Sequence, residues 1–129
     1  SLACTHDLIP TIDEFLQVQR DEVGEGISLG PILTGRPFAP REMIFAGLAD
    51  EEYAILTQLW KLILPVAPTE DRPRQLYAKP EDRWEMNNLA EQHPDIADHL
   101  ELQLRRYLDA RQRGTLADLP PLRKDLLHG

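Results

Sequence analysis

The segment EYAILTQLWKLILP, residues 52–65, is compatible with two secondary structures that imply different folds. In its second half, WKLILP, large apolar residues alternate with Lys61 and Ile63, which is the two-residue period of a β-strand. This period predicts a hairpin in which residues 52–57 form the other strand. A single helix over residues 51–64 also fits, because isoleucine and leucine recur there at helical spacing. We interpret the segment as a hairpin.

Other segments add strands and a long helix to this hairpin. Further strands are predicted over residues 41–48 and 74–78. The clearest element is a helix over residues 94–113, with Pro94 at its first position and Gly114 directly after its end. The fold class is therefore predicted to be α+β, with a small antiparallel sheet of three to four strands and a long C-terminal helix packed across it.

The two ends of the chain are predicted to differ in order. Near the beginning, Asp7 can cap a short N-terminal helix over residues 8–18, whose apolar side chains share one face. At the other end, residues 115–129 contain Pro120-Pro121 and show no sustained period. We expect this tail to be extended, lying on the surface or frayed.

Length, composition and charge exclude several classes of protein. The chain has 129 residues, with 42% hydrophobic and 28% charged residues, an ordinary balance for a soluble globular domain. No apolar run approaches the ~20 residues that a membrane span needs. The net charge of −8 argues against a nucleic-acid partner, because lysine and arginine supply affinity for the phosphate backbone. The single cysteine, Cys4, cannot form a disulfide within the chain.

The residue types that could act in catalysis or bind a metal do not form a complete motif in this sequence. His93 and His99 are six positions apart and fall on different faces of a helix, so they are not a metal site. Cys4 and His6 are close only in sequence, which is no sign of a catalytic pair. Ser28 lies in GISLG, which has the glycine spacing of a nucleophile elbow but lacks the preceding strand. The sequence therefore predicts no catalytic residue and no metal site.

Four stretches, in order, resemble the C-terminal part of sulfatases of the alkaline-phosphatase superfamily. The stretches are THDLIPTIDEFLQV (5–18), EGISLGPILTG (25–35), YAILTQLWKLIL (53–64) and LYAKPEDRWEMNNLAEQHPDIADHLELQL (76–104). The last stretch is similar to the family's Leu-Tyr-Asp-Leu…Asp-Pro-x-Glu-x-x-Asn-Leu-Ala run. It departs from that run at Ala78, Lys79 and Arg83.

The resemblance implies a domain organisation. Residues 1–24 correspond to the end of the catalytic-domain region and a loop, residues 25–114 to the sulfatase C-terminal subdomain, and residues 115–129 to an extended tail. In the family, this subdomain is a four-stranded antiparallel sheet crossed by one long helix. The family's calcium ion and formylglycine belong to the catalytic domain, and the Cys/Ser-x-Pro/Ala-x-Arg context of the formylglycine is not found around Cys4.

The resemblance also implies a role. It predicts a C-terminal segment of a sulfuric ester hydrolase that supports the fold, has no cofactor of its own and is inactive alone. Its partner would be the catalytic domain of the same polypeptide, and the separated chain would self-associate. Lys61 and Trp60 are the residues we expect to face the substrate, a cation beside an aromatic plane. The alternative for this pair is a solvated lysine and a core tryptophan.

Two other functions remain open from the sequence. The chain could be a free-standing, non-catalytic protein-interaction module with the same fold. The parent could also be a phosphonate or phosphate ester hydrolase of the same superfamily.

Overall fold

The computed structural model describes residues 2–20, 24–48, 51–114 and 120–126. The chain forms two compact units, residues 1–41 and residues 42–129. No helix in the described residues is both long and apolar enough to cross a membrane.

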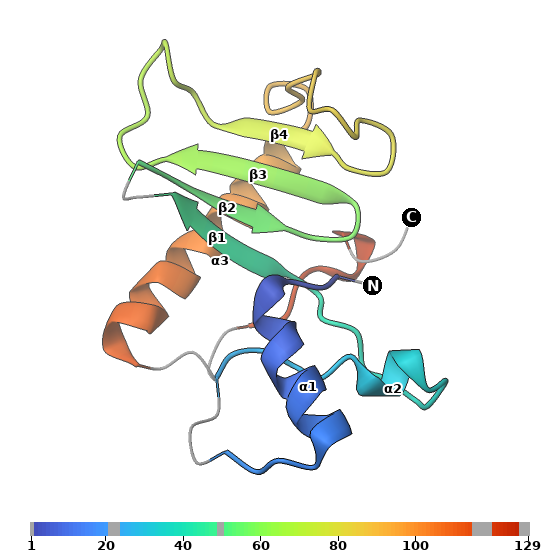
Figure 1. Cartoon of the computed structure of the whole chain (residues 1–129). Coiled ribbons are helices and arrows are strands. Elements are labelled where there is room, and N and C mark those ends of the chain that lie inside the picture. Colours follow the sequence, from blue (N-terminus) through green and yellow to red (C-terminus); the bar gives the residue numbers. More distant parts are fainter. Residues whose placement is uncertain (1, 21–23, 49–50, 115–119, 127–129) are drawn as a thin grey trace. The chain divides into compact units, whose positions relative to one another are not determined.

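The larger unit contains the predicted hairpin within a four-stranded sheet (Figure 1). The strands β1 (Ile44–Leu48), β2 (Glu52–Leu56), β3 (Trp60–Pro65) and β4 (Gln75–Ala78) are antiparallel and lie in chain order. The predicted first strand, 41–48, was three residues too long at its start. The helical alternative for residues 51–64 is wrong.

Thr57 explains how the hairpin turns without a glycine. Its backbone N–H donates to the carbonyl of Trp60 at 2.8 Å, and its hydroxyl oxygen accepts a hydrogen bond from the Trp60 N–H at 3.0 Å. The buried threonine therefore binds both the carbonyl and the N–H of Trp60 and holds the two ends of the turn together. The turn leads directly into the close pairing of β2 with β3, in which Ile55 lies opposite Leu62.

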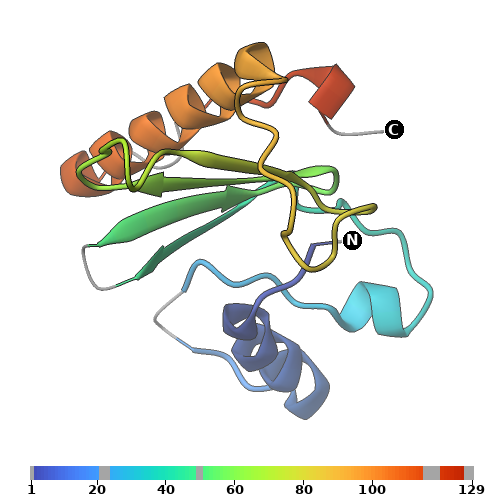
Figure 2. The same cartoon turned by 90° about the horizontal axis from the view of Figure 1, so that it is seen from above.

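The long helix α3 (Pro94–Arg113) crosses one face of the sheet (Figures 1 and 2) and has the predicted bounds. It ends at Gly114, where φ is 73°, a conformation that glycine adopts without steric cost. A hydrophobic core fills the space between this helix and the sheet. Its fully buried members are Ile55, Leu62, Leu76, Ala97 and Leu100.

The C-terminal tail is more ordered than predicted. Residues 120–126 are not frayed, because Leu122 and Leu126 are buried in the same core and residues Lys124–Leu126 form the short 3-10 helix η3. The alternative that this segment lies on the surface agrees with the exposure of residues 121 and 123–125. Two leucines four positions apart supply enough apolar surface to hold this segment against the unit. Residues 115–119 and 127–129 of the predicted tail lie outside the described residues.

The smaller unit contains the 3-10 helix η1 (Thr5–Asp7), the helix α1 (Leu8–Leu16) and the single helical turn α2 (Gly30–Leu33). Helix α1 ends two residues before the predicted Val18, because Gln17 turns to a left-handed conformation with φ 55°. Asp7 precedes α1 as predicted, but its side chain does not cap that helix. That carboxylate binds other groups, which are described below.

Candidate functional site

The two residues predicted to face the substrate lie on opposite faces of the sheet. Successive side chains of a strand point to opposite sides, and Trp60 and Lys61 are neighbours in β3. Trp60 packs against the core, with its ring 5.5 Å from that of His93 just before α3. Lys61 is on the other face, beside Tyr77 of β4. The two side chains therefore do not form a single contact surface.

Lys61 belongs to a three-residue ion cluster. Its Nζ lies 2.9 Å from both carboxylate oxygens of Glu85, and the Nζ of Lys79 lies 2.8 Å from one of them. All three side chains are about one-quarter exposed. Burial by itself would raise the pKa of Glu85, but the hydrogen bonds from Lys79 and Lys61 outweigh it and leave the pKa below its ordinary value. Glu85 is therefore an ionised link between Lys61 of β3 and Lys79, which directly follows β4.

The loop that carries Glu85 is fixed at several points. The carboxylate of Asp82 accepts hydrogen bonds from the backbone N–H groups of Met86 and Asn87, each at 2.9 Å. The side-chain oxygen of Asn88 accepts from the N–H groups of Leu76 and Ala90, each at 3.0 Å. These residues tie the loop after β4 back to the sheet. Nothing in the sequence pattern singled out Lys79 as a partner of Glu85.

This anchored loop presents large side chains to solvent. Trp84 is 78% exposed and Met86 is 79% exposed, on either side of Glu85. The guanidinium of Arg83 lies 5.5 Å from the centre of the Trp84 ring, a cation–π distance. A hollow of about 440 Å³ adjoins the loop, lined in part by Asp82, Asn87 and Gln92.

The backbone at Glu85 is strained, which leads to a testable prediction. Its φ is 57°, in the left-handed region that is unfavourable for residues other than glycine. We expect Glu85→Ala to lower the free energy of unfolding by about 1–2 kcal/mol, because the two lysines lose their counterion while the strain remains. Glu85→Gly should lose roughly 1 kcal/mol less, because glycine relieves the strain. Urea denaturation of both variants measures this order, and a glycine variant less stable than the alanine variant would contradict it.

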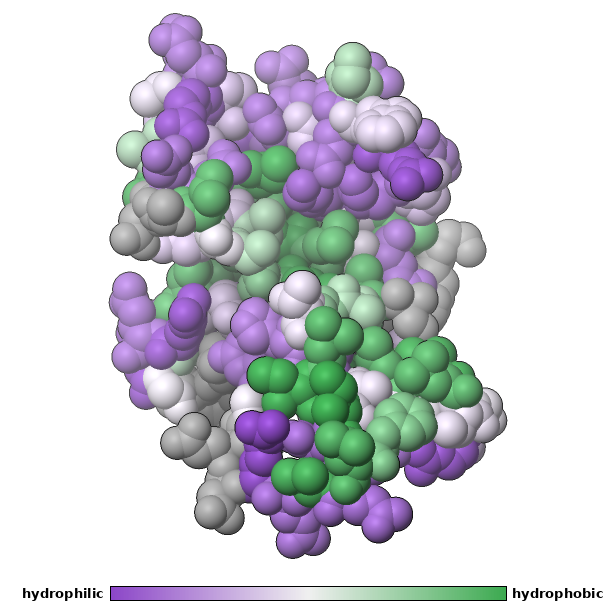
Figure 3. All heavy atoms as spheres, in the orientation of Figure 1, coloured by the Kyte–Doolittle hydropathy of each residue, from purple (hydrophilic) through white to green (hydrophobic). Residues whose placement is uncertain are grey.

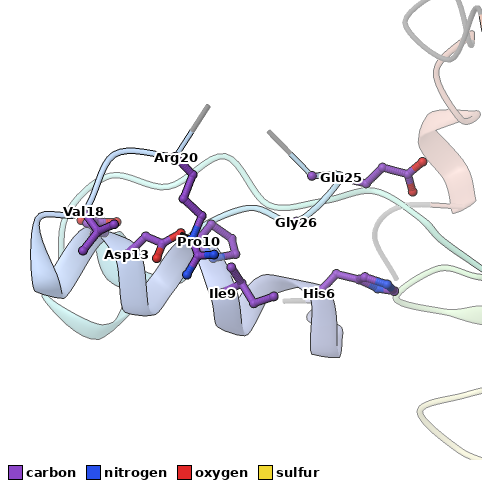
Figure 4. Close-up of a pocket in the computed structure, with 10 residues that line it drawn as sticks. His6, Ile9, Pro10, Asp13, Val18, Arg20, Glu25 and Gly26 are labelled. Carbon is purple, nitrogen blue, oxygen red and sulfur yellow. Dashed lines mark hydrogen bonds and ion pairs between the residues drawn. The ribbon is translucent and has the colours of Figure 1, made fainter. Parts of the chain in front are cut away.

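The smaller unit has a groove along α1 (Figure 4). Its volume is about 880 Å³, and its lining includes the apolar residues Ile9, Pro10 and Val18 together with His6, Asp13 and Arg20. Arg20 lies 2.6 Å from Asp13 in an exposed ion pair across one part of the groove. This pair neutralises the charge of Asp13. Among the described residues that line it, the groove combines an apolar surface with the Asp13–Arg20 ion pair, and they form no arrangement of acid, base and nucleophile.

A buried ion pair organises the smaller unit. The carboxylate of Asp7 is fully buried and binds the guanidinium of Arg41 through two contacts of 2.8 Å. It also accepts hydrogen bonds from the backbone N–H groups of Cys4 and Ile27, each at 2.9 Å. The Arg41 hydrogen bonds, with these backbone donors, hold the pKa of Asp7 well below its usual range despite its burial. The arrangement is structural, because every acceptor oxygen is already engaged.

The other candidates from the sequence have local roles or stand apart. Ser28 donates a hydrogen bond to Glu14 and accepts one from the N–H of Gly30 at 3.0 Å, and residues 24–27 before it form no strand. Arg36 also binds Glu14. Among the described residues, no group of three or more histidine, cysteine, aspartate or glutamate side chains could hold a metal ion.

Comparison with known proteins places this fold. The sequence matches no protein-family model and no curated protein. Solved structures do match. A Bacteroides thetaiotaomicron protein named BT33336S-sulf, from a study of glycosaminoglycan metabolism, is 25% identical with a TM-score of 0.58, over 78% of this chain and 24% of its own. A 2-O GAG sulfatase is 20% identical with a TM-score of 0.66, over 88% of this chain and 26% of its own.

The matches are not confined to sulfatases. The phosphonate monoester hydrolase of Agrobacterium radiobacter is 20% identical with a TM-score of 0.58, and the match covers 86% of this chain and 26% of that enzyme. The fold is therefore one that occurs both in sulfatases and in a phosphonate monoester hydrolase. The chain is sulfatase-like, and it spans about a quarter of the length of the proteins it matches.

Proposed function

We propose that this chain is the C-terminal subdomain of a sulfatase, and that its role is to complete the fold of the catalytic domain. The observation that carries the proposal is the asymmetry of the structural matches. They cover 78% and 88% of this chain, but only 24% and 26% of the matched proteins. A segment of this kind contributes to an activity whose reacting groups lie elsewhere in the polypeptide.

The catalytic groups of such an enzyme would come from outside this chain. The described residues offer no metal-binding cluster, and Cys4 stands beside Arg41 and Asp7 in the buried ion-pair network described above. We assign the calcium ion and the formylglycine to the catalytic domain of the same polypeptide. The chain itself then needs no cofactor.

Helix α1 supplies a surface for that domain. Its apolar residues Leu8, Ile9, Ile12, Phe15 and Leu16 are between 53% and 68% exposed. Figure 3 shows apolar side chains gathered over this helix. A soluble protein does not usually expose so many large apolar side chains on one helix, and such patches mark contact sites. The catalytic domain is the partner that the proposal assigns to this face.

The same face gives a prediction for the separate chain. Without its partner, the chain should form dimers or higher oligomers through α1, because association removes the apolar face from water. Sedimentation velocity at increasing concentration should show this association, and Ile12→Glu with Phe15→Glu should abolish it. The control is Trp84→Glu, which adds a charge at an apolar residue of the larger unit that is even more exposed than Ile12 and Phe15. A wild-type chain that stays monomeric at high concentration would contradict the prediction.

Lys61 and Trp60 are proposed to act at the substrate cleft in different ways. Lys61, on the sheet face opposite the core and about one-quarter exposed, is the candidate for contact with an anionic substrate, while Trp60 would support it from the core side. In the whole enzyme, Lys61→Ala should raise KM with little change in kcat. Unchanged KM in a correctly folded variant would remove Lys61 from the substrate site.

The phosphonate monoester hydrolase match supports a second candidate parent. A sulfatase and a phosphonate ester hydrolase are distinguished by the substrates that the whole polypeptide cleaves. The coding sequence distinguishes a sulfatase subdomain from a free-standing interaction module. Sequencing the coding region upstream of this segment should reveal a Cys/Ser-x-Pro/Ala-x-Arg context if the parent is a formylglycine sulfatase.

A further inference from the structure

The C-terminal segment 120–126 covers one side of α3. Leu122 and Leu126 are 4% and 1% exposed, in the core shared with the sheet. The amide of Gln103, in the middle of α3, donates to the carbonyl of Pro121 at 3.3 Å. The backbone N–H of Leu122 approaches a carboxylate oxygen of Glu42 at 3.5 Å. Apolar burial and few, long hydrogen bonds hold this segment in place.

Two buried polar atoms on α3 lack partners beneath this cover. They are Nε2 of His99 and Oε1 of Gln103, and neither has a hydrogen-bond partner in the part of the chain that the structure describes. The two residues are four positions apart and therefore lie on the same face of the helix. This site accommodates a neutral histidine. Protonation is unfavourable here, because it places a charge on a ring whose Nε2–H has no acceptor.

The charged groups around His99 reinforce this preference. Arg123 of the segment and Arg106 of α3 both disfavour the protonated ring, while Asp125 favours it. Asp125 is itself paired with Arg123 at 2.5 Å, and Arg123 also lies 3.8 Å from Asp95 at the start of α3. Burial, together with the two arginines, lowers the pKa of His99 below its ordinary value.

We propose that residues 120–126 are a pH-sensitive cover on α3, held while His99 is neutral and released when His99 is protonated. Because the pKa of His99 is lower in the covered state than in an exposed state, acid favours the uncovered state. The cover is therefore fully held above the ordinary histidine pKa of about 6.5 and weakens as the pH falls below it. Release would expose Leu122, Leu126 and the α3 face beneath them.

Amide hydrogen exchange on the 129-residue chain tests the cover directly. Protection factors, which correct for the intrinsic effect of pH, should be compared at pH 7.5 and pH 5.0. In the wild type, the Leu126 amide should lose protection at least tenfold at pH 5.0, while the Leu62 amide in the sheet keeps it. His99→Gln should keep the protection of Leu126 at both pH values. The matched control, His6→Gln in the smaller unit, should behave like the wild type.

Two results would overturn the proposal. One is a wild-type cover whose protection does not change with pH, and the other is an equal loss in the wild type and in His99→Gln. NMR titration of the His99 ring provides an independent measurement that needs no variant. A titration midpoint at or above the ordinary histidine value would also overturn the proposal.

Discussion

Replacing Asp7 with alanine should unfold much of residues 1–41. The substitution leaves the Arg41 guanidinium without its carboxylate and leaves the N–H groups of Cys4 and Ile27 without acceptors. Removing one partner of a buried ion pair costs about 3–5 kcal/mol, because the other charge stays desolvated. A unit as small as this one has little stability in reserve. We therefore expect amides in α1 to lose their protection from hydrogen exchange, while the Ile55 amide in β2 keeps it.

A matched variant separates this effect from a general loss of ion pairs. Arg20→Ala breaks the pair with Asp13, but the Arg20 side chain is 59% exposed. Exposed pairs of this kind contribute at most about 1 kcal/mol. Equal protection of α1 in Asp7→Ala and in the wild type would show that the buried pair does not organise the unit.

Leu100→Ala should be among the most damaging truncations on α3. Leu100 is fully buried between the helix and the sheet. Truncating a buried leucine to alanine costs about 2–5 kcal/mol, which includes the lost apolar burial and the cavity left behind. We expect urea denaturation to show a loss in this range for the unit formed by residues 42–129.

Leu102 provides the control on the same helix. It is the same residue type two positions away, but it is 46% exposed. Leu102→Ala should therefore cost less than about 1 kcal/mol, since little apolar surface returns to water. Similar losses in Leu100→Ala and Leu102→Ala would contradict the packing of α3 against the sheet.

The elements with strong periodic patterns were predictable from the sequence. Helix α3 has the predicted bounds, because Pro94 and Gly114 are residues with well-defined preferences at helix ends. The β2–β3 hairpin was predicted from the alternation of residues 60–65, although its turn lacks glycine. The Thr57 side chain stabilises that turn through a local hydrogen bond, which the periodicity of apolar residues does not indicate.

Long-range pairings could not be predicted from patterns. Asp7 looked like a helix cap in the sequence, but its carboxylate binds Arg41, 34 positions away. Leu122 and Leu126 looked like part of a frayed tail, because a single pair of leucines has no detectable period. In each case the decisive contact is made in three dimensions, by residues that are ordinary in their local sequence.

The candidate site was predicted only in part. Lys61 was chosen from the resemblance, but the Lys61–Glu85–Lys79 cluster depends on the left-handed conformation at Glu85. No local preference indicates that conformation for a glutamate. Lys61 and Trp60 are adjacent in the sequence, but their side chains point to opposite faces of the sheet, because side chains alternate along a strand.

Hydrolysis of an aryl sulfate ester tests the central claim most directly. The assay should compare the purified 129-residue chain with the whole polypeptide translated from the reading frame that contains it. We predict turnover by the whole polypeptide and none by the chain alone, because the proposed function assigns the reacting groups to a catalytic domain outside this chain. Turnover by the chain alone, at a rate that survives repurification, would contradict the account.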